Sequence, residues 1–290
     1  MHACLDDLVI ALYVFIDDLL DSRPRHGRPP RISDAELVCL AIAQVLLDAG
    51  SERRWLRLVG DRLGHLFPYV PQQPGYNKRL RRLAPVICAV LRELVAASPS
   101  VCDRVRLLDS TPVPCAASRE TVKRSELAGY ATYGYCASHS RYFWGFRLYL
   151  LSTPDGLPVD FALAPANTPE RDVAAAMLDR QPLHPGQVLV TDKGFASADF
   201  ETFVADMGAL VVRPDRNDER ARFGTLGGMR QWVESIIDTL KGQLDLEGHG
   251  GRTLQGVFAR VVQRLAALAA AIWFNWQLHT PGRHLVAYDH

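Results

Sequence analysis

A change of hydrophobic period near residue 103 is the feature that most limits how this chain folds. Before this point, apolar residues recur every three to four positions, a spacing typical of amphipathic helices. After it, short apolar runs such as 105–108 and 188–191 are typical of buried strands. Strands that alternate with helical segments predict a mixed sheet covered by helices. We therefore expect an all-helical domain over residues 1–100 and an α/β domain over residues 101–290.

Local signals divide both domains into elements. Ser33 and Glu36 form a capping box that opens a helix running through Leu47. The turn sequence Thr153-Pro154-Asp155-Gly156 predicts a hairpin between the strands on either side of it. The expected helices are 5–20, 33–47, 52–66, 76–97, 168–180, 197–207, 227–246 and 253–278. The expected strands are 105–113, 142–151, 157–163, 187–191 and 209–213.

Composition and charge exclude several classes of protein. A net charge of +1 means that any nucleic-acid contact must come from a local basic cluster. The six cysteines are isolated and lack zinc-ligand spacing, so they are expected to be small core residues in a reducing compartment. Four aspartates interrupt the apolar N-terminal segment, which excludes a secretory signal. The apolar run Leu265–Trp276 is shorter than the roughly 20 residues that span a bilayer. These features predict a soluble cytoplasmic protein without a membrane partner.

Two aspartates follow strand-like runs at equivalent positions. Asp109 follows residues 105–108, and Asp192 follows residues 188–191. In an extended strand each aspartate shares a face with alternate apolar residues, so both would continue the packed side of their strands. Ligand sites in sheets of this kind favour strand ends. We expect the two carboxylates to meet at neighbouring strands.

Glu234 is the third candidate acid, and it lies in the helix expected over 227–246. At 100° per residue, Arg230, Glu234 and Lys241 fall within about 40° of each other, at the rim of the apolar arc formed by Trp232, Val233, Ile236, Leu240 and Leu244. Ile237 lies at the border of that arc, and Asp238 is the main rival to Glu234.

The three acids together suit phosphodiester chemistry. Two divalent ions about 3.5–4 Å apart activate one oxygen and stabilise the other, and such ions take oxygen ligands. Each acid alone has an ordinary explanation, as a turn residue, a loop residue or half of a surface ion pair. The hypothesis therefore depends on their joint occurrence, in this order, on these elements.

At these residues the chain resembles the DDE transposases of bacterial insertion sequences, in the IS4-like group and most closely the IS982 family. The resemblance spans nearly the whole chain and is carried by the segments 5–7, 73–81, 108–112, 142–150, 165–168, 191–195 and the pattern Arg230-x3-Glu234-x6-Lys241. The related signature has a tyrosine at the position of Gly227. This departure leaves the role of that tyrosine unfilled without affecting the acids.

The resemblance implies an RNase H-like catalytic domain preceded by an all-helical DNA-binding domain. Asp109, Asp192 and Glu234 would be the catalytic acids and would hold Mg²⁺ or Mn²⁺, as two ions. Arg230 and Lys241 match basic positions that would contact DNA. The partners would be double-stranded DNA, namely the terminal inverted repeats of a transposon and the target DNA. Because both transposon ends must be handled, a homodimer or a higher assembly on DNA is expected.

Other basic residues are further candidates for DNA contact. Lys193 follows Asp192 and is placed to contact phosphate beside the site. The densest basic cluster comprises Lys78, Arg79, Arg81 and Arg82, in a helical segment that we expect to recognise terminal repeats. Residues 114–141 interleave arginine and lysine with tyrosine, and are either an ordered insertion that contacts DNA or a solvated loop. Trp144 and the tyrosines near it are expected in the core.

Three alternatives remain beside the transposase hypothesis. A metal-dependent nuclease of the same fold would cut DNA without joining it. A catalytically idle DNA-binding protein descended from a transposase would bind repeats and release no 3′ ends. An aspartic-type hydrolase built on Asp109-Ser110-Thr111 is disfavoured, because Pro112 stands where that motif needs glycine and the chain has no second copy.

Overall fold

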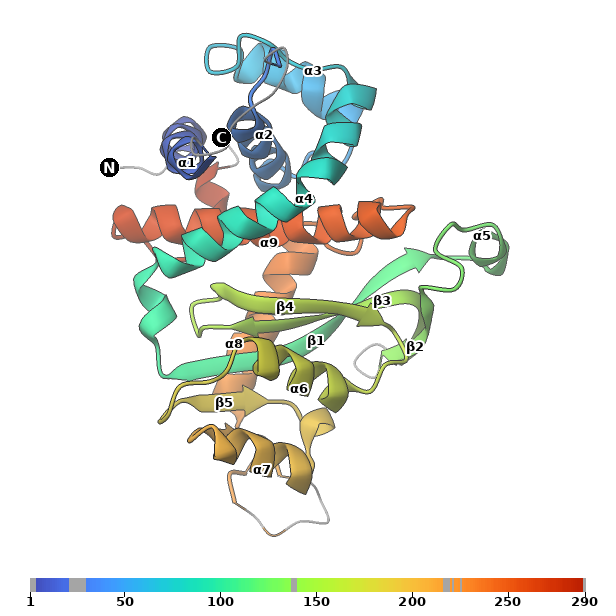
Figure 1. Cartoon of the computed structure of the whole chain (residues 1–290), viewed down its shortest axis with the longest axis vertical. Coiled ribbons are helices and arrows are strands. Elements are labelled where there is room, and N and C mark those ends of the chain that lie inside the picture. The colour runs from blue at the N-terminus through green and yellow to red at the C-terminus, as the bar shows by residue number, and fades with distance from the viewer. Residues whose placement is uncertain are drawn as a thin grey trace. The chain divides into compact units, whose positions relative to one another are not determined.

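The chain folds into two compact units, shown in Figure 1. The computed structural model describes residues 4–20, 30–136, 140–215, 220, 222–224 and 226–288, without the side chains of residues 230, 286 and 287. The helical unit comprises Met1–Ser98, Leu240–Gly251 and Gln255–His290, and the sheet unit comprises Pro99–Thr239 and Arg252–Leu254. The expected boundary near residue 100 coincides with the first division. The segments after residue 239 differ from the expected domains, because most of them pack with the N-terminal helices.

The helical unit is built from the expected N-terminal helices and the long C-terminal helix. Its α-helices are α1 (Leu5–Leu20), α2 (Asp34–Leu46), α3 (Glu52–Arg62), α4 (Gln73–Ala96) and α9 (Leu254–Gln277), followed by the 3₁₀ helix η5 (Leu285–Tyr288). The predicted capping box is confirmed, since Ser33 Oγ accepts from the Glu36 backbone at 3.0 Å and Glu36 accepts from the Ser33 backbone. Helix α4 begins earlier than expected because Pro74 suits the first turn of a helix.

Helix α9 forms the centre of the helical unit. It is long and apolar enough to cross a bilayer, yet 89% of its most apolar window is buried inside the protein. Trp273 packs on Phe15 of α1, with ring centroids 5.2 Å apart. Gln263, which is buried in the middle of α9, donates 2.7 Å to the carbonyl oxygen of Ala41 in α2. A helix that is apolar on all sides is buried by its neighbours, so α9 is a core helix of this unit.

The sheet unit contains one six-stranded mixed sheet with the order β2-β3-β1-β5-β6, with β4 also paired to β3. Its strands are β1 (Val105–Ala116), β2 (Thr132–Cys136), β3 (Arg141–Ser152), β4 (Pro158–Pro165), β5 (Val188–Thr191) and β6 (Leu210–Val212). Its α-helices are α5 (Arg119–Lys123), α6 (Glu170–Arg180), α7 (Ala198–Asp206) and α8 (Gly227–Asp238). The 3₁₀ segments are η1 (Pro99–Cys102) and η3 (Lys193–Phe195), and the π-helical segment η4 (Thr239–Gln243) follows α8. Both the predicted hairpin, now β3 and β4, and the predicted mixed sheet are confirmed.

Helices cover both faces of this sheet (Figure 1). On one face, Leu108, Tyr149 and Leu151 pack with apolar residues of α6 and α7. On the other face, Leu107 and Leu150 line a small hollow with residues of α8. Because side chains alternate across a strand, Asp109 shares the face covered by α8, while Ser110 shares the face covered by α6 and α7.

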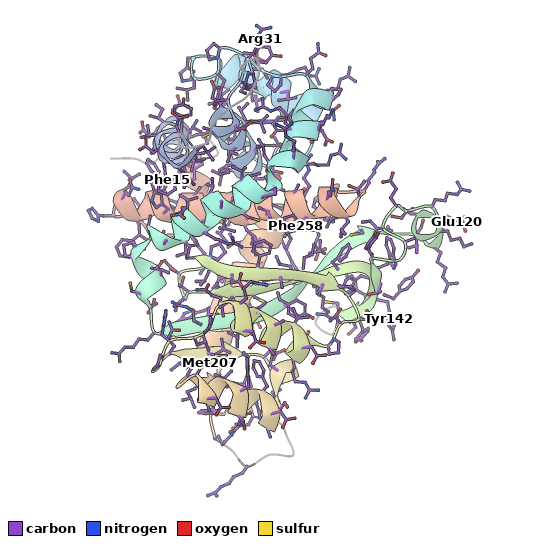
Figure 2. All side chains as sticks on the ribbon, viewed as in Figure 1. Phe15, Arg31, Glu120, Tyr142, Met207 and Phe258 are labelled. Carbon is purple, nitrogen blue, oxygen red and sulfur yellow. The ribbon has the colours of Figure 1, made fainter. Side chains whose placement is uncertain are left out.

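The described part of the segment 114–141 contains regular structure, and the tyrosines in and beside it are not where we expected them. Strand β1 continues to Ala116, α5 and β2 follow, and residues 137–139 lie outside the described residues. Trp144 is buried as expected, whereas Tyr142 is 77% exposed (Figure 2). The core prediction was therefore wrong for Tyr142 and for the similarly exposed Tyr133 and Tyr135. Tyr133 and Tyr135 belong to β2, the edge strand of the sheet, and Tyr142 is paired with Tyr135 across β2 and β3.

Candidate functional site

The sheet brings Asp109 and Asp192 level with each other. Strands β1 and β5 are parallel neighbours, and their last paired residues are Leu108 and Thr191. In both strands the next residue is the aspartate, so the two aspartates lie side by side, at the usual strand spacing of about 4.8 Å. Asp192 ends its strand and turns into η3, whereas β1 continues past Asp109 because β3 still pairs with it, with Leu150 opposite Asp109. The sequence prediction of meeting strands is confirmed for this pair.

The carboxyl group of Asp109 is in an unfavourable setting for negative charge. Burial, together with the charges of Asp192 and Glu170, raises its pKa from 3.8 to about 7. A hydrogen bond from the Ser110 backbone and the charge of Arg147 act in the opposite direction and are too weak to cancel the burial. Asp192 is exposed, and its carboxylate accepts a 2.6 Å hydrogen bond from the backbone N–H of Lys193. A cation beside both groups would relieve their repulsion.

Helix α8 places Glu234 over the same face of the sheet as Asp109. The hollow next to Asp109 is lined by Val233, Ile236 and Ile237 of α8. Glu234 directly follows Val233 and is exposed. The expected apolar arc is confirmed at Val233 and Ile236, and Ile237 belongs to it. The placement of Trp232 on that arc was wrong, since its side chain is 44% exposed.

Two of the three acids follow adjacent paired residues of neighbouring strands, and the third lies on α8, the helix that covers the face of Asp109. In the part of the chain that the structure describes, no three histidine, cysteine, aspartate or glutamate side chains are grouped closely enough to hold one metal ion. The pair of Asp109 and Asp192 nevertheless fits a hard cation. Such ions take oxygen ligands, and Mg²⁺ often uses one or two carboxylates and keeps several waters.

Comparison with known proteins identifies the family. The family model described as Transposase DDE domain matches residues 100–270, which is more than half of the chain. The chain belongs to this family. A comparison with curated proteins gave no match. Members of the Transposase DDE domain family catalyse phosphoryl transfer on DNA, so this chain is an enzyme of the transposase type. The mixed sheet with flanking helices agrees with the RNase H-like fold of the family.

Glu170 is a residue of the site that sequence analysis missed. It lies at the start of α6, and its Oε1 accepts a hydrogen bond from Ser110 Oγ at 2.9 Å. The guanidinium of Arg147 is 3.3 Å from the same oxygen. One sequence signal could have indicated it, because Thr168-Pro169-Glu170 is a helix start and Thr168 ends a segment of family resemblance.

The proposed DNA-contacting residues are distributed over both units. In the sheet unit, Lys193 is exposed in η3 beside Asp192, and Arg230 lies in α8 with its side chain outside the described residues. In the helical unit, Lys241 forms an ion pair with Glu247 at 3.3 Å. Three members of the basic cluster on α4, Lys78, Arg81 and Arg82, are exposed. Arg79 instead pairs with Asp34 and donates 2.9 Å to the carbonyl oxygen of Ile32.

The raised pKa of Asp109 gives a prediction for the metal-free protein. When an acid has a higher pKa in the folded protein than in the unfolded chain, the free energy of unfolding falls as the pH rises from the unfolded pKa to the folded pKa. For Asp109 this range is about pH 4 to pH 7. Asp109→Asn removes that loss. We therefore expect the variant to melt at a higher temperature than the wild type at pH 8 in EDTA, and to gain much less at pH 4.5.

The measurement is thermal unfolding across this pH range. The matched control is Asp199→Asn, which changes an exposed aspartate of α7 and should show no gain with pH. Adding Mn²⁺ at pH 8 should stabilise the wild type more than Asp109→Asn, since a ligand stabilises only the form that binds it. A difference between Asp109→Asn and wild type that does not change with pH would contradict the assignment.

Proposed function

We propose that this protein is the DNA transposase of a bacterial insertion sequence of the IS982 type, within the IS4-like group. It cleaves strands at the ends of its element and joins them to target DNA. The observation that carries the proposal is the side-by-side placement of Asp109 and Asp192, with Asp109 on the face that the helix of Glu234 covers, in a chain of the Transposase DDE domain family. Such an enzyme acts in the cytoplasm, on the nucleoid.

In this proposal Asp109, Asp192 and Glu234 hold divalent cations, Mg²⁺ or Mn²⁺, as two ions. The bound metal supplies activation of the attacking oxygen and neutralises charge on the phosphate. The chain itself supplies the arrangement. The sheet fixes the two aspartates on adjacent strands, and α8 brings Glu234 over the same face. Lys193, which is exposed beside Asp192, contacts the phosphate backbone, with Arg230 and Lys241 as further DNA contacts.

A cleavage and joining assay tests this function. The substrate is an end-labelled duplex carrying either end of the genomic element that encodes the chain, with Mg²⁺ or Mn²⁺ and a supercoiled plasmid as target. We expect nicks at the element end and covalent joining of the freed 3′ end to the plasmid. Cleavage without joining would support the nuclease alternative, and binding without cleavage in either metal would support the idle DNA-binding protein.

The helical unit is proposed to bind the terminal repeats, as one partner of a homodimer or higher assembly on DNA. The support is the exposed basic surface of α4 formed by Lys78, Arg81 and Arg82. Arg79 lies on the same helix, but its pairing with Asp34 gives it a structural contact within the unit.

Replacing Lys78, Arg81 and Arg82 together by alanine should weaken DNA binding and make it less sensitive to salt. Each lost phosphate contact lowers the slope of log affinity against log salt by about 0.9, so the slope should fall by about 2.7. The measurement is the fluorescence anisotropy of a labelled duplex at KCl concentrations of roughly 50 to 200 mM, where affinity depends strongly on salt. Arg92→Ala, at an exposed position further along α4, is the control. An unchanged slope in the triple variant would remove this surface from DNA binding.

A further inference from the structure

Glu170 contacts both segments that carry the paired aspartates. Its Oε1 accepts from Ser110 Oγ, and Ser110 directly follows Asp109. Its Oε2 lies against Gly194, the second residue after Asp192, so closely that a Cβ at Gly194 would be 2.4 Å from that oxygen. A side chain at position 194 would therefore displace the carboxylate from this place. One side chain therefore spans the gap between β1 and the turn after β5.

Arg147 of β3 holds this carboxylate in place. Its Nη1 is 3.3 Å from Glu170 Oε1 and 3.2 Å from Ser110 Oγ, and its Nη2 donates 2.6 Å to the carbonyl oxygen of Tyr135 in β2. The Arg147 side chain is only 14% exposed. A guanidinium fixed at both ends restrains its partner, and it also balances the negative charge of Glu170. This carboxylate is thus occupied by protein partners.

The contacts of Glu170 come from the opposite face of the sheet. Ser110 points away from the face of Asp109, because neighbouring residues of a strand alternate. Glu170 therefore does not touch the aspartates directly. It fixes Ser110 and Gly194, and the backbone transmits this restraint to Asp109 and Asp192. Groups that orient metal ligands in this way commonly change metal affinity or activity by about 10–100-fold when they are removed.

We propose that Glu170 is a positioning residue that sets the separation of Asp109 and Asp192 by joining Ser110 to Gly194, with Arg147 as its anchor. The inference rests on the proposed function, since it takes the two aspartates as ion-holding groups. It assigns to Gly194 a steric role, namely to leave space for the Glu170 carboxylate beside the turn after Asp192.

A double-mutant cycle tests this role. Glu170→Ala and Gly194→Ala should each weaken Mn²⁺ binding and slow strand cleavage by about 10–100-fold, the first by removing the link and the second by displacing Oε2. Because both changes break one contact, adding Gly194→Ala to Glu170→Ala should cost little more. Mn²⁺ binding is measured by electron paramagnetic resonance without DNA, cleavage in a single turnover, and folding by thermal unfolding. Glu170→Gln, which removes the charge and keeps the shape, is measured as well. Its charge-matched control is Asp172→Asn, because Asp172 is an exposed acid in the same turn of α6.

Additive losses from the two changes, or full Mn²⁺ affinity and full cleavage in Glu170→Ala, would overturn the positioning role while leaving the proposed function intact. Should Glu170→Ala fail to fold, Glu170→Gln takes its place, because it preserves the shape and loses the charge that pairs with Arg147. A wild-type protein that binds Mn²⁺ but does not cleave DNA overturns the proposed function, and the cycle is then decided by Mn²⁺ affinity. A wild-type protein that does neither overturns both.

Discussion

Asp192→Ala is expected to lower single-turnover DNA cleavage by about a thousandfold or more. The carboxylate stands level with Asp109 on the adjacent strand and faces solvent, where DNA and ions can approach. Removing a metal-holding group forfeits several kcal/mol of charge stabilisation, and each 1.36 kcal/mol is about tenfold in rate. The fold should be preserved because the side chain is exposed.

The measurement is the release of labelled strand from an element end in Mg²⁺. The control is Asp199→Ala, which removes an exposed carboxylate from α7 in the same unit and should cleave like the wild type. Normal cleavage by Asp192→Ala would remove this residue from the mechanism. The same assay separates Glu234 from its neighbour on α8, with Glu234→Gln expected to be inactive and Asp238→Asn active.

Periodicity and capping predicted most elements of this fold, because they are local properties of the chain. The meeting of Asp109 and Asp192 was also predictable, since two apolar runs ending in aspartate become neighbouring strands of one sheet. Glu170 was not predictable in this way. Its contact with Ser110 joins residues 60 positions apart, and it depends on where α6 begins against β1.

Two other differences have physical causes that a helical or strand pattern does not reveal. Strand β2 alternates, but the larger side chains, Tyr133 and Tyr135, face solvent while Gly134 and Cys136 face inward. The prediction that the tyrosines near Trp144 lie in the core was therefore wrong for both. The predicted helix 227–246 is divided in the structure, where α8 ends at Asp238 and residues 239–243 form a π-helix. The apolar pattern continues across this point, so a change of hydrogen bonding there leaves no signal in the sequence.

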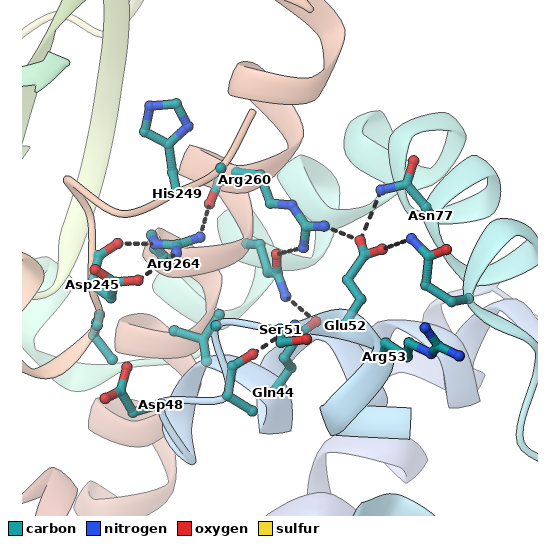
Figure 3. Close-up of a pocket in the computed structure, with 17 residues that line it drawn as sticks. Gln44, Asp48, Ser51, Glu52, Arg53, Asn77, Asp245, His249, Arg260 and Arg264 are labelled. Atoms are coloured by element: carbon teal, nitrogen blue, oxygen red, sulfur yellow. Dashed lines mark hydrogen bonds and ion pairs between the residues drawn. The ribbon is translucent and has the colours of Figure 1, made fainter. Parts of the chain in front are cut away.

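Glu52→Ala should destabilise the helical unit by about 3–5 kcal/mol. Glu52 is 9% exposed and forms an ion pair with Arg260 of α9 (Figure 3). It also accepts from Gln73 at 2.7 Å and from Asn77 at 2.8 Å, both in α4. One carboxylate thus joins α3, α4 and α9 beside a pocket of about 390 Å³. Removing one partner of such a buried pair leaves the other charge uncompensated, which is the origin of this cost.

The measurement is urea unfolding, with Glu93→Ala as the control at an exposed position of α4, where a change within about 0.5 kcal/mol is expected. The helical unit carries the basic surface of α4, so this variant also separates folding from DNA contact. At temperatures where Glu52→Ala remains folded, its salt slope for DNA binding should equal that of the wild type, because Lys78, Arg81 and Arg82 are intact. A loss of stability below about 1 kcal/mol would mean that water replaces the carboxylate beside Arg260, and that contacts other than those of Glu52 hold these helices together.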